Sequence, residues 1–319
     1  QDLDDANSTS ARVRVLYEPS DTFRAHFTAQ IFDEDRNGAA QKGLLDPTPN
    51  ARELRQDSRA DYELTAELYS VVLEWDLEAF SIKSLTSYQN DDVLINRDND
   101  RNDLAVLAPF AQLPSVYVPE TNKQKTITQE INLISGAPLF GKMDWVAGVF
   151  YLDTEVEISI RELLDFNFNG TFDPFTRAQV FAFDPAAEIG FISDSKPERD
   201  STSIYGQGTW NFNEEWRAVF GLRYTEDEVY SAVTNFFGRT GTDIIEMDSE
   251  KVTGRLVLEH DFSESTMGFA SYTRGFKPGG SNLTYGLESV VAPVVVLPTF
   301  DEEIVDAFEI GLKNTGLYT

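Results

Sequence analysis

Apolar and polar positions alternate with a period of two over many segments that are rich in Val, Ile, Thr, Tyr and Phe. This period predicts β-strands with one apolar and one polar face, because successive side chains of a strand point to opposite sides of a sheet. In residues 23–31, Phe23, Ala25, Phe27, Ala29 and Ile31 alternate with Arg24, His26, Thr28 and Gln30. In residues 204–212, Ile204, Gly206, Gly208, Trp210 and Phe212 alternate with Tyr205, Gln207, Thr209 and Asn211. In residues 146–161, the apolar set is Val146, Gly148, Phe150, Leu152, Val156, Ile158 and Ile160, and the polar set is Asp153, Glu155, Glu157 and Arg161.

The same pattern predicts eleven strands and no helix. They lie near residues 10–17, 22–33, 61–74, 78–91, 124–135, 143–162, 201–212, 215–232, 250–261, 266–277 and 303–314, and a twelfth strand could begin at Gly316. Several exceed the usual length of about five or six residues for strands of soluble sheets. A length of about ten residues is what a tilted strand needs to cross a bilayer.

Two kinds of connection alternate along the chain. The tight ones are residues 18–21, 75–78, 136–142, 213–215, 262–265 and 313–316, and the long ones are roughly residues 34–60, 92–123, 163–200, 233–249 and 278–302. In an antiparallel meander, alternate connections lie at opposite ends of the sheet. Short turns at one end, long loops at the other and long alternating strands are typical of an outer-membrane β-barrel.

Aromatic residues gather beside the tight turns. They are Tyr17, Phe23, Trp75, Phe80, Trp145, Phe212, Trp216 and Phe262. This placement fits a girdle at a membrane interface. Aromatic residues also favour the strands of soluble sandwiches, so a soluble β-sandwich stays open as an alternative.

Composition narrows the classes of function. The 54 acidic and 26 basic residues leave a net charge of −28, which repels nucleic acid phosphates and excludes that partner. There is no cysteine, so neither a disulfide nor a thiolate metal site can form. The only histidines are His26 and His260, too few for a multi-histidine metal centre. No apolar run reaches the length of about 18 residues that a transmembrane helix requires, and residues 1–10 lack the features of a signal peptide.

The stretch SYTRGFKPGGSN (271–282), followed by FDEEIVDAFEIGLKN (300–314), resembles the barrel of TonB-dependent outer-membrane receptors. The matching residues are Arg274, Gly275, Phe276, Lys277, Gly279, Gly280, Glu303, Glu309, Gly311, Leu312 and Lys313. Residues 11–23, 128–152 and 204–227 also look like this family, so the resemblance covers nearly all the predicted strands.

The resemblance implies an up-and-down barrel of about 22 strands in the outer membrane of a Gram-negative bacterium. Such a receptor carries a plug domain, which receives energy through TonB and works within the barrel during uptake of a bulky solute. We expect this chain to be an internal fragment holding about half of the barrel, with the plug and the C-terminal strands absent from it. The expected ligand is a ferric siderophore; vitamin, oligosaccharide and aromatic-compound uptake stay open.

The resemblance also suggests where a ligand and the plug would make contact. Aromatic residues of the long loops are the expected ligand contacts: Phe110, Tyr117, Phe166, Phe168, Phe172, Phe175, Phe236, Phe237 and Tyr285. Charged residues on the polar faces are expected to line the lumen and to contact the plug: Arg14, Arg24, His26, Glu63, Glu67, Lys83, Glu130, Arg217, Arg223, Arg255 and Glu259.

Three stretches resemble the first half of a calcium-binding loop, because oxygen ligands stand at alternate positions. They contain Asp33, Asp35 and Asn37; Asp98, Asp100 and Asn102; and Asp165, Asn167 and Asn169. None has the Glu that an EF-hand requires at position twelve. A structural Ca²⁺ in these loops is a hypothesis, and the alternative is an ordinary loop of an acidic protein.

No pattern indicates an enzyme. There is no G-x-S-x-G motif and no phosphate-binding glycine loop, and no pair of carboxylates stands out by its spacing. A barrel enzyme would require His26 to meet a nucleophile. The function classes left open are an active receptor, a passive porin-like channel and a soluble binding module.

Overall fold

The computed structural model describes residues 5–39, 41–50, 52–56, 58, 60–102, 115–165, 189–236, 242–281 and 299–316. The strands are β1 (Ser8–Ser20), β2 (Phe23–Asn37), β3 (Asp61–Asp76), β4 (Phe80–Asp98), β5 (Ser115–Ser135), β6 (Met143–Asp165), β7 (Ile189–Asn211), β8 (Trp216–Phe236), β9 (Asp243–Ser263), β10 (Thr266–Lys277), β11 (Gly280–Ser281), β12 (Thr299–Phe300) and β13 (Glu303–Asn314). Within these ranges no helix has the length and apolarity needed to cross a membrane, a finding that does not bear on crossing by strands.

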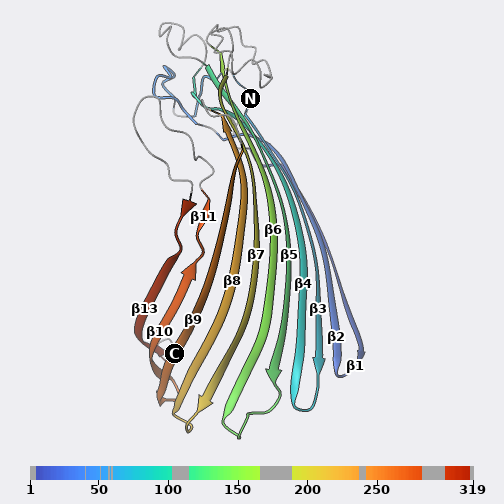
Figure 1. The fold of residues 1–319 in the computed structure, drawn as a ribbon, viewed down its shortest axis with the longest axis vertical. Coiled ribbons are helices and arrows are strands. Elements are labelled where there is room, and N and C mark those ends of the chain that lie inside the picture. The colour runs from blue at the N-terminus through green and yellow to red at the C-terminus, as the bar shows by residue number, and fades with distance from the viewer. Residues whose placement is uncertain are drawn as a thin grey trace.

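Eleven of the strands form one long, curved antiparallel sheet (Figure 1). Its order is β1-β2-β3-β4-β5-β6-β7-β8-β9-β10-β13, so each strand pairs with the next strand of this sheet along the chain, while β11 and β12 pair with each other between β10 and β13. β1 and β13 are its two edges, and the sheet is not closed into a barrel. This arrangement confirms the all-β, up-and-down fold class predicted from the alternation.

All the predicted strands are present, but several are longer than expected at the ends that meet the long connections. β4 continues to Asp98, and β5 begins at Ser115, so much of the loop predicted at residues 92–123 is strand. β7 likewise begins at Ile189, within the loop predicted at residues 163–200. The predicted loops were therefore too long. The possible twelfth strand beyond Gly316 lies outside the described residues.

The tight turns lie together at one end of the sheet (Figure 1). The longest of them, residues 136–142, turns through Phe140 and Gly141, whose φ angles are 54° and 67°. It is held by hydrogen bonds from the Gly141 N–H to the Pro138 carbonyl and from the Lys142 N–H to the Leu139 carbonyl. This turn returns the chain from β5 to β6.

One face of the sheet, here called the outer face, carries a broad belt of exposed apolar side chains. The belt includes Val13, Val15, Phe27, Tyr69, Leu73, Ile127, Ile131, Val149, Ile204, Phe220, Leu222, Val252, Leu256, Phe308, Ile310 and Leu312. The register places these residues in rows across neighbouring strands. A belt of this extent on a single sheet is suited to contact with lipid, because soluble proteins rarely expose such large apolar patches.

Aromatic residues border this belt at both ends. Trp75, Phe212 and Phe262 are at least half exposed beside the tight turns, as the girdle hypothesis predicted. At the opposite border Tyr151, Tyr224 and Tyr272 donate hydrogen bonds to Asp200 (3.0 Å), Glu226 (2.7 Å) and Asp306 (2.8 Å). Tyrosine suits such a border, because its ring can stay in the apolar belt while its hydroxyl reaches a polar partner.

Beyond the second border the polarity of the outer face changes. The outer face becomes acidic, and a row of cross-strand partners runs Asp153–Asp200–Glu228–Asp248 from β6 to β9. The face opposite the belt, here called the inner face, is partly buried there. Val118, Val233 and Ile245 are among its buried apolar residues, and Ser195, Asp227 and Ser231 are among its buried polar ones. The extension of the sheet past the belt thus has an acidic outer face and a partly buried inner face of mixed polarity.

The register also shows on which face the apolar set of residues 146–161 lies. The apolar set there, from Val146 to Ile160, lies on the inner face, because Gly148 and Phe150 pair with the inner-face residues Asn132 and Glu130. The residues of β6 that join the outer belt are Val149 and Tyr151, together with Ala147.

Candidate functional site on the inner face

Over the height of the belt, the inner face of the sheet carries most of the charged residues predicted for the lumen. Arg24, His26, Arg217, Arg223 and Arg255 all lie on this face by strand register. Their expected contacts with a plug or a ligand stay predictions.

Glu63 and Glu67 were assigned to the wrong face. Both alternate with the inner-face residues of β3 and share the outer face with Tyr69 and Val71. They lie just past the border of the apolar belt, where the outer face becomes acidic. Alternation alone did not reveal this, because a polar residue beyond the belt belongs to the same face as the apolar residues within it.

A first charged cluster lies near the tight turns on β2, β3 and β4. Arg24 Nη2 is 2.9 Å from Asp76 Oδ2, and Arg24 Nε is 3.7 Å from Glu74. Lys83 Nζ is 2.8 Å from the other oxygen of Glu74. Ser81 donates a further hydrogen bond to Asp76. The cluster pairs each carboxylate with a cation, so its main effect is to tie three strands together.

A second cluster joins β5, β6 and β7. Tyr205 on β7 reaches across β6, where its hydroxyl donates to Glu130 and lies 2.5 Å from Asn132 Oδ1. Gly148 on β6 leaves the space for this: a Cβ there would lie 2.6 Å from the Tyr205 hydroxyl. Sequence reasoning named Glu130 but missed Tyr205 and Gly148. Their shared position on the polar face would have indicated the contact only if the strand register had been known.

Arg223 and Arg255 lie next to this cluster on β8 and β9. The Arg223 guanidinium is 5.2 Å from the ring centre of Tyr205 and 5.3 Å from that of Phe150, which are cation–π distances. Neither arginine forms a salt bridge with a described residue. A hollow of 240 Å³ along β7 to β10 is lined in part by Tyr205, Arg223 and Arg255. Among the predicted lumen arginines that line this hollow, both therefore lack a carboxylate partner within the described ranges.

A third cluster lies beside the tight turns on β8 and β9. Arg217 forms salt bridges with Glu259 and with Asp261, the second at 2.7 Å. All three side chains are about one-third exposed or less. The arginine therefore satisfies two carboxylates that would otherwise repel each other.

Past the belt, the inner face of β7 and β8 holds an ion pair with a buried carboxylate, which sequence reasoning missed. Arg199 donates to Asp227 Oδ1 from Nε (2.9 Å) and from Nη2 (2.5 Å), and Asp227 is only 2% exposed. Asp227 Oδ2, Ser195 Oγ and Ser231 Oγ are buried and have no hydrogen-bond partner among the described residues. Continuing the polar alternation of β8 past Arg223 would have found Asp227.

The connection between β2 and β3 is organised around one lysine. Lys42 Nζ donates to the carbonyl oxygens of Thr48 (2.6 Å) and Asn50 (2.9 Å) and to the Thr48 hydroxyl (2.7 Å). Asp46 accepts hydrogen bonds from the Thr48 N–H and hydroxyl and from the Arg55 N–H. These hydrogen bonds, with Lys42 nearby, lower the pKa of Asp46 to about 2. A structured loop thus lies at the end of the sheet opposite the tight turns.

Two of the aromatic residues predicted in long loops belong to strands instead. Tyr117 is in β5, and Phe236 is the last residue of β8. The hairpins extend further than predicted, so these positions are part of the sheet. Phe110, Phe166, Phe168, Phe172, Phe175, Phe237 and Tyr285 lie outside the described residues. A ligand contact by any of these residues stays a prediction.

The first of the three calcium-like stretches is not a loop. Asp33, Asp35 and Asn37 lie in β2, where alternate residues point the same way but are spaced along an extended strand. The Asn37 side chain and N–H donate to the carboxylate of Asp5. A calcium loop needs oxygens that converge on one point, which an extended strand does not provide.

The second calcium-like stretch forms turns that use its own oxygens. Asp98 accepts hydrogen bonds from the backbone N–H groups of Ser58 and Arg101, and Asp100 accepts from those of Asn102 and Val116. This is the ordinary turn role of Asp. Asp165 ends β6, and Asn167 and Asn169 lie outside the described residues. In the part of the chain that is described, no group of three or more His, Asp or Glu side chains could hold a metal ion. The calcium hypothesis stays untested.

Together, the apolar outer belt, the two aromatic borders, the polar inner face and the grouping of tight turns at one end define the wall of an outer-membrane-type β-barrel. Residues 2–319 match the family model described as TonB dependent receptor-like, beta-barrel. The chain therefore belongs to the TonB-dependent receptor family, as the resemblance of residues 271–314 indicated. A comparison with curated proteins found no significant sequence match.

Solved structures agree with this assignment. The ferric yersiniabactin uptake receptor FyuA from Yersinia pestis superposes with a TM-score of 0.76 at 13% identity, over 98% of this chain and 43% of its own. The siderophore receptor PiuA from Acinetobacter baumannii superposes with a TM-score of 0.63 at 14% sequence identity, over 98% of this chain and 48% of its own. The copper transporter OprC superposes with a TM-score of 0.63 at 14% sequence identity, over 97% of this chain and 45% of its own. At these identities the likeness establishes the fold alone, and this chain spans less than half the length of each relative.

Proposed function

We propose that the protein containing this barrel wall takes up a scarce, bulky solute across the outer membrane of a Gram-negative bacterium, with energy delivered through TonB. The observation that carries the proposal is the family match over the whole sheet. Receptors and transporters, rather than enzymes, make up the structural neighbours named above.

The favoured solute is a ferric siderophore, because FyuA and PiuA are described as siderophore receptors. The copper transporter OprC has the same degree of structural likeness as PiuA, so the fold supports metal uptake in general as well. The ligand class therefore has to be determined by an uptake experiment.

Among the charged residues of the inner face, Arg223 and Arg255 are the best candidates for contact with the plug or the solute. Arg24 and Arg217 already neutralise neighbouring carboxylates. Arg223 and Arg255 form no salt bridge with a described residue and border the 240 Å³ hollow. Their guanidinium groups can therefore donate to an incoming carboxylate or other oxygen-rich group without first breaking an ion pair.

The test is uptake by the full-length receptor in a strain from which the native gene is deleted. Iron-limited growth and uptake of radioactive iron are measured with a panel of ferric siderophores, in the presence and absence of TonB. We expect at least one siderophore to be taken up only when both the receptor and TonB are present. Uptake that persists without TonB would identify a passive channel, and failure with every ferric siderophore would overturn the favoured solute.

Two variants examine the inner face in the same assay. Arg223→Gln with Arg255→Gln is expected to reduce uptake, whereas Lys196→Gln, which removes a cation from the outer face, is expected to leave it unchanged. Equal uptake by both variants would refute the role of the two arginines while leaving the transport function intact.

A further inference from the structure

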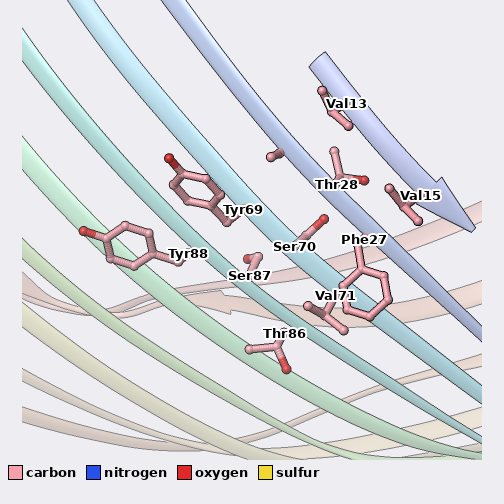
Figure 2. A pocket seen from close by; sticks show the side chains of 11 residues that line it. Val13, Val15, Phe27, Thr28, Tyr69, Ser70, Val71, Thr86, Ser87 and Tyr88 are labelled. Carbon is pink, nitrogen blue, oxygen red and sulfur yellow. The ribbon is translucent and has the colours of Figure 1, made fainter. Parts of the chain in front are cut away.

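The outer face contains an apolar hollow of 410 Å³ that the transport function does not require (Figure 2). It lies on β1 to β4, within the belt and directly below its second aromatic border. The side chains of Val13, Val15, Phe27, Val71, Tyr69 and Tyr88 surround it.

The hollow exists because the residue at its floor is small. Ala29 is paired with Val13 on one side and with Tyr69 on the other. The surface of the outer face is therefore recessed at Ala29, between two larger side chains. The rings of Tyr69 and Tyr88 are stacked, with centroids 6.4 Å apart, and form its upper wall (Figure 2). A belt residue larger than alanine would fill this space.

The position in the belt restricts what can occupy the hollow. Its lining is almost wholly apolar, and the residues around it are those that contact lipid in a barrel of this class. Water would find few hydrogen-bond partners there. Hydrocarbon is therefore the occupant that the lining favours.

Two lysines lie on the neighbouring strand β5, just past the border of the belt. On β5, Ile127 is paired with Tyr88, and Lys125 is the next outer-face residue, opposite Asn90. Lys123 follows, with its Nζ 3.4 Å from Asp92. Both lysines are exposed, and among the described residues of β1 to β5 they are the basic side chains of the outer face.

The two lysines differ in charge from most of the outer face around them. Lys125 is paired by register with Glu155 and Lys123 with Glu157, but Lys125 forms no salt bridge with a described residue. The rest of the outer face at this height is mainly acidic, with Glu67 on β3 as an example. An anionic headgroup is therefore repelled over most of this rim and finds cations beside the hollow.

We propose that the hollow binds one acyl chain of an anionic membrane lipid whose headgroup phosphate is held by Lys125 and Lys123. The lipid belongs to the leaflet on the side of the long connections, because the lysines lie at that border of the belt. This proposal depends on membrane placement of the sheet and is independent of the transported solute.

The test is native mass spectrometry of the detergent-purified full-length receptor. The protein is delipidated and then mixed with phosphatidylglycerol or with phosphatidylcholine that has identical acyl chains. We expect retained phosphatidylglycerol to exceed phosphatidylcholine about tenfold, the effect of one charge-assisted contact. Lys123→Gln with Lys125→Gln should abolish this preference, and Ala29→Leu should reduce the retention of phosphatidylglycerol by filling the hollow.

Matched controls separate the site from general effects. Lys196→Gln removes an outer-face lysine on β7, and Ala270→Leu enlarges an outer-face alanine on β10; both should retain phosphatidylglycerol as the unmodified protein does. Heat-modifiable migration on gels checks that each variant is folded, and Ala29→Val replaces Ala29→Leu if the latter is not. Equal retention of the two lipids, an unchanged preference in the lysine variant, or full retention by the folded Ala29 variant would each overturn the proposal.

Discussion

Gly148 provides the sharpest test of the inner-face geometry. Its virtual Cβ lies 2.6 Å from the Tyr205 hydroxyl, 2.7 Å from Tyr205 Cζ and 2.6 Å from Asn132 Oδ1. Such distances are shorter than real Cβ contacts, so Gly148→Ala must displace the tyrosine ring. Displacement breaks the hydrogen bond from Tyr205 to Glu130.

The expected cost is about 1–3 kcal/mol, the range for placing an extra methyl group in a packed site. A hydrogen bond to a charged carboxylate contributes a similar free energy. Moving the ring relieves the clash but loses this hydrogen bond, so the two costs are not added together. We therefore expect the full-length receptor with Gly148→Ala to unfold a few degrees below the unmodified protein. The measurement is thermal unfolding in detergent, followed by circular dichroism.

Gly206 supplies the matched control on the neighbouring strand. A Cβ there would meet only the Val146 carbonyl oxygen, at an ordinary distance of 3.7 Å. Neither glycine has a positive φ, so backbone strain does not separate the two substitutions. Gly206→Ala should leave the unfolding temperature unchanged or raise it slightly.

A double-mutant cycle then locates the cause. In a Tyr205→Ala background, where the ring is absent, Gly148→Ala should cost much less than it does alone. Two results would refute the reasoning: equal unfolding temperatures for the two glycine variants, or the same cost of Gly148→Ala with and without Tyr205.

Three further predictions concern a loop, the outer belt and the third cluster. Because the folded pKa of Asp46 is lowered from 3.8 to about 2, its contribution to the loop is complete above pH 3.8 and is lost as the pH falls through about 2. A carboxyl NMR titration of Asp46 should show this low midpoint, and an ordinary midpoint would contradict the hydrogen bonding. Leu222→Arg should destabilise the protein in membranes by about 2–4 kcal/mol if Leu222 faces lipid, whereas Glu228→Arg beyond the belt should not; equal folded yields in outer-membrane fractions would refute the boundary. Arg217→Ala should lower the unfolding temperature by leaving two carboxylates unpaired, and adding Glu259→Gln should restore part of it; no rescue would exclude charge repulsion as the cause.

The positions of strands and tight turns could be predicted well from the sequence. Alternation is a local property, and each stretch such as residues 23–31 carries it without reference to its neighbours. The turns follow from Gly, Pro, Asn and Asp between alternating segments. The family could be recognised from residues 271–314 for the same reason, since β10, β13 and their connection lie together in the sequence.

The length of the strands past the belt could not be predicted in the same way. In β4 and β5 the residues beyond the belt still alternate, but their acidic and amide side chains are equally common in loops. What extends the strands is pairing with each other, from Asp98 with Tyr117 downward. That pairing depends on two segments distant in sequence.

The candidate site also has a part that the sequence predicted and a part that it did not. The sequence by itself determined that Arg24, Arg217, Arg223 and Arg255 alternate with apolar residues, and hence that they share the polar face of the sheet. Only the tertiary structure decided which of them are neutralised, because the carboxylates that pair with Arg24 and Arg217 come from neighbouring strands in a given register.

The tertiary structure also decided which face is outside at each height. A period of two indicates that the faces differ, but it does not indicate where the apolar belt ends, and the outer face changes from apolar to acidic near Tyr151 and Tyr224. For this reason Glu63 and Glu67 were placed on the wrong face. Local alternation determined the strands of this protein, whereas register across the sheet determined the wall, its ion pairs and the hollow on its outer face.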